Sequence, residues 1–474
     1  MRVFGPLCAL CGTAPPGVLA GGDAGGESSV ADHPQVSSPL SPGAVPDAGV
    51  PRLHRPHLHE IPQLAGRSAD DLLQLRAVAA VLPFRTNRHI TDELIDWDDV
   101  EHDPIYRLTF PAPEMLDPAD LATMTKLLRD DAPAERVAAE ARDIRRRLNP
   151  HPGGQLSLNV PDDGDRPLDG LQHKYAETVL FFPGPGQMCH AFCTYCFRWA
   201  QFVGEPDLRM AGNDPEVLCG YLRRHPEVTD VLITGGDPMV MRTEVLARYL
   251  EPLLAAGLET VRTIRIGTKA VSHWPYRFVT DPDADELCRL FERVVASGRQ
   301  LAVMAHYSHP RELAPAVAGE AVRRIRATGA SVYAQAPLIR GVNDDPETWR
   351  RLWRTGLDLG VVPYYMFVER DTGPRNYFEV PLVRGWQIFR EAWSQMSGLG
   401  RTAKGPVMSA TPGKVLVDGV TEAAGRRLFA LRYVQARDPA LVGRPFFADY
   451  DPEATWFDQL TPAFGEHREF FRPA

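Results

Sequence analysis

The chain has 474 residues, of which 44% are hydrophobic and 24% charged, and its formal net charge is −9 at pH 7. These proportions are ordinary for a soluble globular protein, so the chain can build a core of normal size in one large domain or a few smaller ones. The acidic balance argues against a nucleic acid or an anionic membrane as the main partner. No run approaches the roughly 18 apolar residues of a membrane span. We therefore expect a cytoplasmic protein that binds neither nucleic acid nor membrane.

The first 65 residues are rich in Gly, Pro, Ala, Ser and Val. Such a composition cannot bury enough apolar surface to order itself, and it predicts a disordered leader over residues 1–65. Cys8 and Cys11 form a C-x-x-C pair within this leader. No second ligand pair accompanies them, so we interpret them as incidental cysteines. The odd total of seven cysteines in a long chain argues against a disulfide framework.

Residues 66–150 show helical patterns. An apolar-periodic run opens at Asp70 and Asp71, and the segments that begin at Pro118 and Pro133 carry proline and acidic residues where a first helical turn has them. We predict a helical N-terminal region over residues 66–150.

From about residue 177 onward, strand and helix patterns alternate. Strands are expected at 177–182, 228–234, 261–266, 301–305, 331–336 and 361–367, and helices at 215–224, 242–256, 283–297, 312–328 and 346–359. This alternation is typical of βαβ units with a parallel sheet. We therefore predict an α/β fold, a (β/α) barrel, whole or partial, over residues 151–420, with its chemistry at the C-terminal ends of the strands. Two more strands are expected at 415–420 and 427–435. Residues 421–474 are expected to form a C-terminal extension, of which 436–474 has no functional interpretation.

Three cysteines, Cys189, Cys193 and Cys196, lie on one short segment with the spacing C-x3-C-x2-C. Three thiolates on a tight loop can ligate three irons of a cubane [4Fe–4S] cluster, and the fourth iron then stays open for a substrate. A zinc site completed by His190 is an alternative, but the adjacent Cys189 and His190 would strain a single tetrahedron. The spacing therefore predicts an iron–sulfur cluster on these three cysteines.

Glycine or polar residues end several of the predicted strands. Gly235, Gly236 and Asp237 follow an apolar strand, where two glycines let the backbone approach a ligand and free carbonyls can accept hydrogen bonds from an ammonium group. His306 ends another strand, and Gln335 lies in the next one. Each signal is weak alone, but together these residues would line the mouth in which a cofactor lies.

The cysteine loop resembles that of the radical S-adenosylmethionine superfamily, whose signature has the same spacing and an aromatic residue, here Tyr195, before the last cysteine. The resemblance implies that the open iron chelates the amino and carboxylate groups of S-adenosyl-L-methionine. An electron from the cluster then cleaves that molecule to methionine and a 5′-deoxyadenosyl radical. The resemblance also implies that the strand end at Gly235 and Gly236 holds the methionine ammonium group.

Further motifs resemble the lysine 2,3-aminomutase family, whose members add pyridoxal 5′-phosphate to the radical machinery. The stretches occur in the family's order and are D-P-I-Y-R (103–107), G-L-Q-H-K-Y-A-E-T-V-L (170–180), the cysteine loop, T-G-G-D (234–237), I-R-I-G (264–267), H-Y-S-H-P (306–310), R-G-V-N-D (340–344), P-Y-Y (363–365) and P-G-K (412–414). Only the cysteine loop is specific by itself, and the order of the rest over so long a stretch carries the resemblance.

The resemblance assigns roles to several residues. Lys414 matches the lysine that binds pyridoxal 5′-phosphate covalently, with Lys404 as a nearby competitor. Lys174 and Tyr175 match residues beside that cofactor. Arg198 lies two residues after Cys196, where the family has the arginine that pairs with the substrate carboxylate. A guanidinium suits such bidentate recognition of a carboxylate.

The sequence departs from the family where lysine enzymes hold the distal ammonium group of lysine with two acidic residues. One of these places falls on Arg370, between Glu369 and Asp371, and the other falls nearest Ser409. An arginine there would repel an ammonium group and suit a carboxylate. We therefore expect lysine to be a poor substrate and glutamate to be the first amino acid to try. The family's late cysteine-bound zinc is not expected here, since no cysteine follows Cys288.

The resemblance implies an isomerase, a pyridoxal-phosphate-dependent radical aminomutase that moves an amino group from Cα to Cβ of an amino acid. It also implies an electron donor such as flavodoxin or ferredoxin, and a homo-oligomer. Two alternatives remain: a radical enzyme of the same family with another amino acid substrate or another outcome, and a non-catalytic iron–sulfur binding protein. The last would not need Lys414, Arg198 and the glycine pair together.

Overall fold

The computed structural model describes residues 52–54, 58, 60–164 and 166–471, which all belong to one compact unit. The predicted leader therefore lies largely outside the described residues, and so do Cys8 and Cys11. Among the described helices, none is long and apolar enough to cross a membrane. The expected cytoplasmic location stays a prediction.

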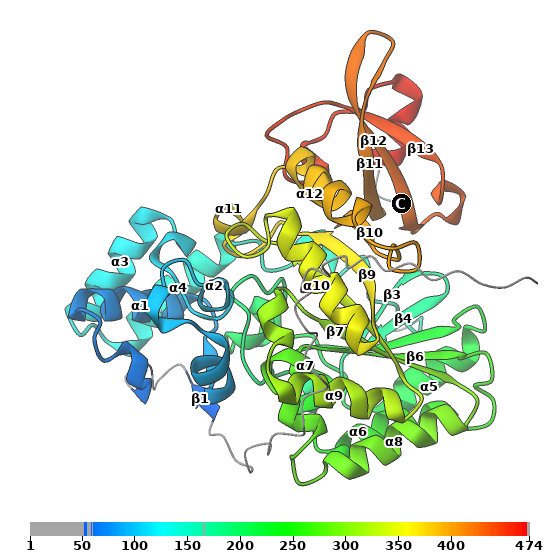
Figure 1. Ribbon diagram of the computed structural model, residues 1–474, viewed down its shortest axis with the longest axis horizontal. Coiled ribbons are helices and arrows are strands. Elements are labelled where there is room, and N and C mark those ends of the chain that lie inside the picture. The colour runs from blue at the N-terminus through cyan, green and yellow to red at the C-terminus, as the bar shows by residue number, and fades with distance from the viewer. Residues whose placement is uncertain (1–51, 55–57, 59, 165, 472–474) are drawn as a thin grey trace, which may run out of the picture. The chain divides into compact units, whose positions relative to one another are not determined.

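Four helices form the N-terminal part, namely α1 (Ala69–Val81), α2 (Pro104–Thr109), α3 (Pro118–Arg129) and α4 (Ala134–Arg147). The side chains of Ser68, Asp103 and Asp117 accept hydrogen bonds from the first backbone N–H groups of α1, α2 and α3. These N-caps explain why the helices begin where they do. Figure 1 shows the four helices gathered beside the large sheet. The helical pattern expected from the sequence is present in this stretch.

Order begins before the predicted end of the leader. Strand β1 (Arg52–His54) pairs antiparallel with β2 (Arg85–Asn87). Ile61 and Leu64 are buried in the same core as the N-terminal helices. Strand β1, Ile61 and Leu64 therefore fall inside the stretch predicted as leader, where a few apolar residues pack against the helices.

The larger sheet has 11 strands whose order follows the chain. They are β3 (Leu171–Tyr175), β4 (Thr178–Phe181), β5 (Asp230–Ile233), β6 (Thr263–Thr268), β7 (Gln300–His306), β8 (Ser331–Leu338), β9 (Val361–Val368), β10 (Lys404–Ser409), β11 (Gly413–Ala423), β12 (Arg426–Ala436) and β13 (Pro445–Asp449). Neighbours from β4 to β10 are parallel. The pairs β3–β4, β10–β11, β11–β12 and β12–β13 are antiparallel. The predicted α/β class with a parallel sheet is confirmed.

Helices connect and cover the parallel strands. They are α5 (Pro215–Arg224), α6 (Thr243–Leu250), α7 (Ala270–His273), α8 (Ala284–Ala296), α9 (Ala316–Ala327), α10 (Pro346–Leu359), α11 (Arg375–Phe378) and α12 (Leu382–Ser394). Side chains such as Leu290 of α8, Ile325 of α9 and Trp349 of α10 pack with strand residues such as Val303 in the largest core cluster. Figure 1 shows α6, α8, α9 and α10 on one side of the parallel strands.

The sheet is open. Its edge strands β3 and β13 do not pair with each other, so the whole barrel, one of the two predicted forms, is wrong. Side chains still bring the β3 edge to the C-terminal strands, since the Lys174 ammonium donates a hydrogen bond to the Ala410 carbonyl between β10 and β11. The predicted boundary between residues 420 and 421 falls inside β11.

Candidate active site

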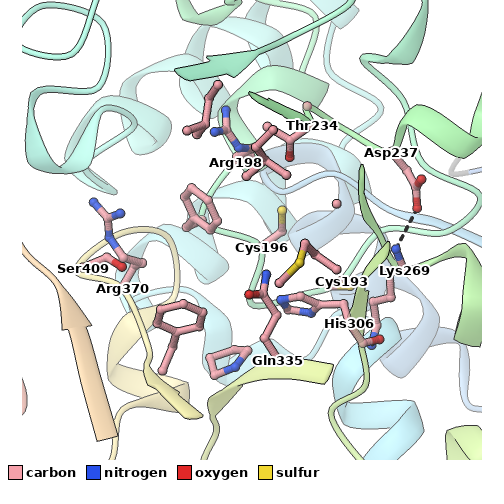
Figure 2. A pocket seen from close by; sticks show the side chains of 18 of the residues that line it. Cys193, Cys196, Arg198, Thr234, Asp237, Lys269, His306, Gln335, Arg370 and Ser409 are labelled. Carbon is pink, nitrogen blue, oxygen red and sulfur yellow. Dashed lines mark hydrogen bonds between the residues drawn. The ribbon is translucent and has the colours of Figure 1, made fainter. Parts of the chain in front are cut away.

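A cavity of about 350 Å³ opens at the C-terminal ends of the parallel strands. Every predicted site residue lines it: Lys174, Tyr175, Cys189, Cys193, Cys196, Arg198, Gly235, Gly236, Asp237, His306, Gln335, Arg370 and Lys414. Figure 2 shows side chains from the cysteine loop, the strand ends and the segment after β9 facing the same space. A concave site at this edge of a parallel sheet is where α/β enzymes bind their ligands.

The N-terminal helices hold the cysteine loop against the sheet. The Arg85 guanidinium donates a 3.0 Å hydrogen bond to the Cys189 carbonyl, and Phe192 N donates to the Arg85 carbonyl at 2.9 Å. Thr194 N donates to the Leu108 carbonyl at 2.9 Å. These contacts join the loop to β2 and α2, so the N-terminal part positions the cysteines.

The three thiols are partly exposed and face the cavity. Burial raises the pKa of Cys193 to about 11 and that of Cys196 to about 12, and the Cys193 thiol adds to this effect at Cys196. Such thiols become thiolates only when a metal replaces the proton. Among the described residues, no three His, Cys, Asp or Glu side chains converge on a position for a single metal ion.

Gly235 and Gly236, which follow β5, lie directly against Gln187 and Met188, which precede the cysteine loop. A Cβ at Gly236 would overlap the backbone of Met188, and one at Gly235, whose φ is +144°, would overlap Gln187. Glycine is required at both positions for this close approach. The structure thus shows the glycine pair close to the segment that leads into the cysteine loop. The predicted contact of the same pair with a bound ligand stays a prediction.

Asp237 joins two strand ends. Its carboxylate accepts hydrogen bonds from the Thr268 hydroxyl at 2.7 Å and from the backbone N–H groups of Met239, Lys269 and Ala270 at 2.9, 2.9 and 3.0 Å. These bonds use its oxygens, so the geometry favours a positioning role for Asp237 over the predicted direct contact with a cofactor.

A buried ion pair behind the cysteines was not anticipated. The Lys269 ammonium donates to Glu312 Oε1 at 2.6 Å and to the His306 carbonyl at 3.2 Å. Burial alone would raise the pKa of Glu312, but Lys269 and His273 outweigh burial and hold that pKa well below its usual range. The available signal in the sequence was the position of Lys269, directly after a strand end at the edge that carries the chemistry.

His306 and Gln335 lie side by side on the neighbouring strands β7 and β8. Burial, with a further contribution from Lys269, lowers the pKa of His306 to about 3, so its imidazole is neutral. The Tyr195 hydroxyl lies 3.3 Å from His306 Nδ1. The two side chains therefore offer neutral hydrogen-bonding groups to whatever occupies the cavity.

Lys414 lies on β11, far from the cysteine loop in the sequence, and lines the same cavity. Its ammonium donates to Gln435 Oε1 at 2.6 Å and lies 5.0 Å from the Tyr365 ring centroid and 5.5 Å from that of Tyr175. Burial, followed by the positive charge of Arg265, lowers the pKa of Lys414 to about 7. Lys404 is exposed at the start of β10 and is not among the residues that line the cavity.

Three further basic side chains, those of Lys174, Arg198 and Arg370, reach the same space. Burial, followed by the charge of Arg370, lowers the pKa of Lys174 to about 6. Arg198 and Arg370 both line the cavity, and so does Glu369, whereas Asp371 does not. Sequence reasoning left open which residue of this trio faces inward. In the structure, Glu369 and Arg370 both face the cavity.

A search for a matching family model returned none. A protein of Aquifex aeolicus (strain VF5), provisionally named L-lysine 2,3-aminomutase, is 31% identical over 411 residues, which cover 87% of this chain and 95% of that protein. The chain belongs to the radical S-adenosylmethionine family of lysine 2,3-aminomutases.

Other members of the lysine 2,3-aminomutase family match over a shorter span. L-lysine 2,3-aminomutase of Fusobacterium nucleatum is 28% identical, and the match covers 50% of this chain and 52% of that protein. The Bacillus subtilis enzyme of the same name is 26% identical, with 54% of each chain covered. The chain thus spans about half the length of these relatives.

Solved structures give weaker likenesses. A radical SAM methyltransferase from Sphaerobacter thermophilus has 16% identity and a TM-score of 0.31, covering 54% of this chain and 85% of the other. SuiB of Streptococcus suis bound to its precursor peptide SuiA has 12% identity and a TM-score of 0.35, with 60% of each chain covered. At these TM-scores the likenesses carry no argument about this protein.

Proposed function

We propose that the protein is a pyridoxal-phosphate-dependent radical aminomutase that moves the amino group of an amino acid from Cα to Cβ. One observation carries the proposal. A single cavity brings together three cysteine thiols, a glycine strand end and a lysine amine whose pKa lies near neutrality. Family membership supports the same reaction class, since the related enzymes named above are lysine 2,3-aminomutases.

The residues present fit the three cofactors that this reaction needs. The thiols of Cys189, Cys193 and Cys196 would hold a [4Fe–4S] cluster, and the Lys414 amine would bind pyridoxal 5′-phosphate. When bound, the cluster with S-adenosyl-L-methionine supplies a radical that abstracts hydrogen, and pyridoxal 5′-phosphate supplies the group on which nitrogen migrates.

The protein's own residues would bind and orient the cofactors and the substrate, and shield the radical from water. Carbonyls at the strand end of Gly235 and Gly236 can accept hydrogen bonds from the methionine ammonium, while His306 and Gln335 offer neutral polar groups beside it. Tyr175, 8% exposed, gives the ring of pyridoxal 5′-phosphate an aromatic neighbour. Placing the reacting groups in one enclosed space limits side reactions of the radical with water.

Lys174 and Arg198 provide hydrogen-bond donors for the anionic groups of cofactor and substrate. The Lys174 ammonium is fixed by its hydrogen bond to Ala410, and it lines the cavity together with Lys414. We assign Lys174 to the cofactor phosphate and Arg198 to the substrate carboxylate, because a guanidinium binds a carboxylate bidentately. A reductant such as flavodoxin or ferredoxin would supply the electron, and a homo-oligomeric state remains part of the proposal.

The test is anaerobic reconstitution with iron, sulfide, pyridoxal 5′-phosphate and S-adenosyl-L-methionine, followed by a screen of amino acids for β-amino products. We expect 5′-deoxyadenosine and a β-amino acid from at least one substrate. Cys193→Ala should lose the cluster absorbance and the cleavage of S-adenosyl-L-methionine. Lys414→Ala should keep the cluster absorbance and lose the β-amino product.

Two results would contradict the proposal. A fully loaded protein that cleaves S-adenosyl-L-methionine yet isomerises no amino acid would point to another outcome of the radical chemistry. A protein that binds a cluster but neither pyridoxal 5′-phosphate nor S-adenosyl-L-methionine would instead be a non-catalytic iron–sulfur protein.

A further inference from the structure

Two guanidinium groups enter the cavity and share one aromatic neighbour. Arg198 follows the cysteine loop and is 6% exposed, and Arg370 follows β9 with 18% of its side chain exposed. The guanidinium carbons of Arg198 and Arg370 lie 5.1 and 5.4 Å from the centroid of the same ring, Phe197. The two cations are therefore held near each other, on side chains that come from different segments (Figure 2).

Neither guanidinium is neutralised well by the protein. Arg198 Nη1 is buried without a hydrogen-bond partner, and no described carboxylate lies within ion-pair distance of Arg198. Arg370 Nε is likewise buried without a hydrogen bond, and its ion pair with Asp371 is long, at 3.7 Å. Burial lowers the pKa of Arg370. A buried charge without a partner is costly, so both groups favour a ligand that brings negative charge.

Two residues from other parts of the chain, Trp456 and Gly153, also lie against Arg370. Its guanidinium carbon lies 5.7 Å from the ring of Trp456, a residue of the C-terminal extension that is 4% exposed. On another side, Gly153 leaves room for it, since a Cβ at that glycine would lie 2.9 Å from Arg370 Nη2. A planar guanidinium fixed by an aromatic ring and a glycine gap is suited to oriented binding of a carboxylate.

We propose that the cavity takes an α-amino acid whose side chain ends in a carboxylate, with Arg198 pairing the α-carboxylate and Arg370 the side-chain carboxylate. This inference rests on the proposed function, because that function makes the cavity an amino acid site. It names the substrate class within the reaction and gives the C-terminal extension a role through Trp456.

Two other readings use the same groups. Glu369, 7% exposed, also lines the cavity and could face the ammonium group of a basic substrate. Burial raises the pKa of Glu369 well above its usual range, which disfavours its charged form in the cavity. Alternatively, Arg370 could bind the cofactor phosphate, since its charge also acts on Lys174. The experiment separates these readings from the proposal.

The experiment measures binding, so that it does not depend on turnover. Equilibrium dialysis of the protein loaded with cluster and pyridoxal 5′-phosphate compares L-glutamate, L-glutamine and L-lysine. Glutamate and glutamine have nearly the same shape, so their affinity ratio reports on the side-chain charge. We expect glutamate to bind best, and Arg370→Gln to weaken glutamate about 10- to 100-fold while glutamine changes little.

Two further variants control for loss of folding and for unspecific effects of removing an arginine. Arg370→Lys retains the charge and should keep part of the preference for glutamate, which guards against a folding defect in Arg370→Gln. Arg390→Gln is a matched control, since Arg390 lies 5.7 Å from the Trp386 ring on an exposed helix face and should leave all affinities unchanged. The content of pyridoxal 5′-phosphate is measured in each variant.

Each contrary outcome has its own meaning. Tighter binding of lysine than of glutamate, abolished by Glu369→Gln, would overturn the proposal in favour of a basic substrate. Equal loss of all three amino acids and of pyridoxal 5′-phosphate in Arg370→Gln would overturn it in favour of a phosphate contact. Selective glutamate binding without any β-amino product would leave this inference standing and contradict the proposed function alone.

Discussion

Burial sets the charge state of the amines in the cavity. The pKa of Lys414 falls to about 7 and that of Lys174 to about 6, and removal from water is the largest cause in both cases. A lysine amine must be neutral to attack an aldehyde, and an ordinary exposed lysine is almost fully protonated at neutral pH. Lys414 therefore has the property that a cofactor-binding lysine needs, whereas Lys404 is exposed and does not line the cavity.

We predict that attachment of pyridoxal 5′-phosphate depends on pH with a midpoint near 7. Below that pKa the Lys414 amine is protonated and cannot attack, and above it the amine is free, so attachment should be about ten times slower at pH 6 than at pH 8. Stopped-flow absorbance of the cofactor measures the rate, and borohydride reduction with peptide mapping locates the label. Lys404→Ala should behave as the wild type. A label on Lys404, or a midpoint near the ordinary lysine pKa, would refute the assignment.

At the scale of elements, two glycines and one aspartate bring the ends of strands β5 and β6 together with the cysteine loop. The end of β5 reaches the cysteine loop through Gly235 and Gly236, and Asp237 ties it to the end of β6 through Thr268. Because parallel strands end at one edge, residues from β5, β6, β7 and β8 face the same cavity. The position of the cysteine loop is thus set by the sheet as well as by the N-terminal helices.

We predict that Gly236→Ala separates folding from radical formation. The new Cβ would overlap the backbone of Met188, so the cysteine loop must shift, while the strand core beneath it is untouched. The variant should keep its circular dichroism and lose at least 10-fold in cleavage of S-adenosyl-L-methionine, as measured by 5′-deoxyadenosine. Gly66→Ala is the matched control, because a Cβ there would meet nothing within 4 Å. Full cleavage activity in Gly236→Ala would show that the close approach is not needed.

The elements that sequence patterns predicted best are those with local signals. The helices expected at 215–224 and 346–359 coincide with α5 and α10, each of which begins with proline after a capping Asp. Strand β10, which contains Gly405 and Pro406, was not predicted from the sequence, yet it forms between β9 and β11, which pair with it on both sides. Long-range pairing of this kind is not visible in a local pattern.

The residues of the candidate site likewise fall into two groups, those in local sequence motifs and those that only the fold brings together. The cysteine spacing and the glycine pair are local motifs, and the sequence identified them. The pair of Lys269 and Glu312 joins residues 43 positions apart, and Trp456 reaches Arg370 from the C-terminal extension. Only the folded chain brings these groups together, so sequence reasoning could name Arg370 but not what holds it.

At the scale of the whole molecule, the C-terminal extension continues the large sheet and packs against residues near the ends of β9 and β10. Strand β11 crosses the predicted boundary at 420 and pairs with β10 on one side and β12 on the other. Val368 of β9 and Met408 of β10 share one buried cluster with Phe446 and Trp456. The extension is therefore expected to unfold with the parallel strands and not as a separate unit.

Phe446→Ala tests this coupling. Phe446 is fully buried and its ring stacks on those of Tyr433 and Phe470, at centroid distances of 5.3 and 4.6 Å, so truncation should cost about 3–5 kcal/mol of unfolding free energy. If the extension and the parallel strands are one cooperative unit, hydrogen exchange followed by mass spectrometry should show faster exchange in β5 to β9 as well as in β11 to β13. Leu399→Ala, at a position 93% exposed, is the control and should change neither. Faster exchange confined to β11–β13 would instead show that the extension opens on its own, and Arg370 would then lose its Trp456 support in that open state.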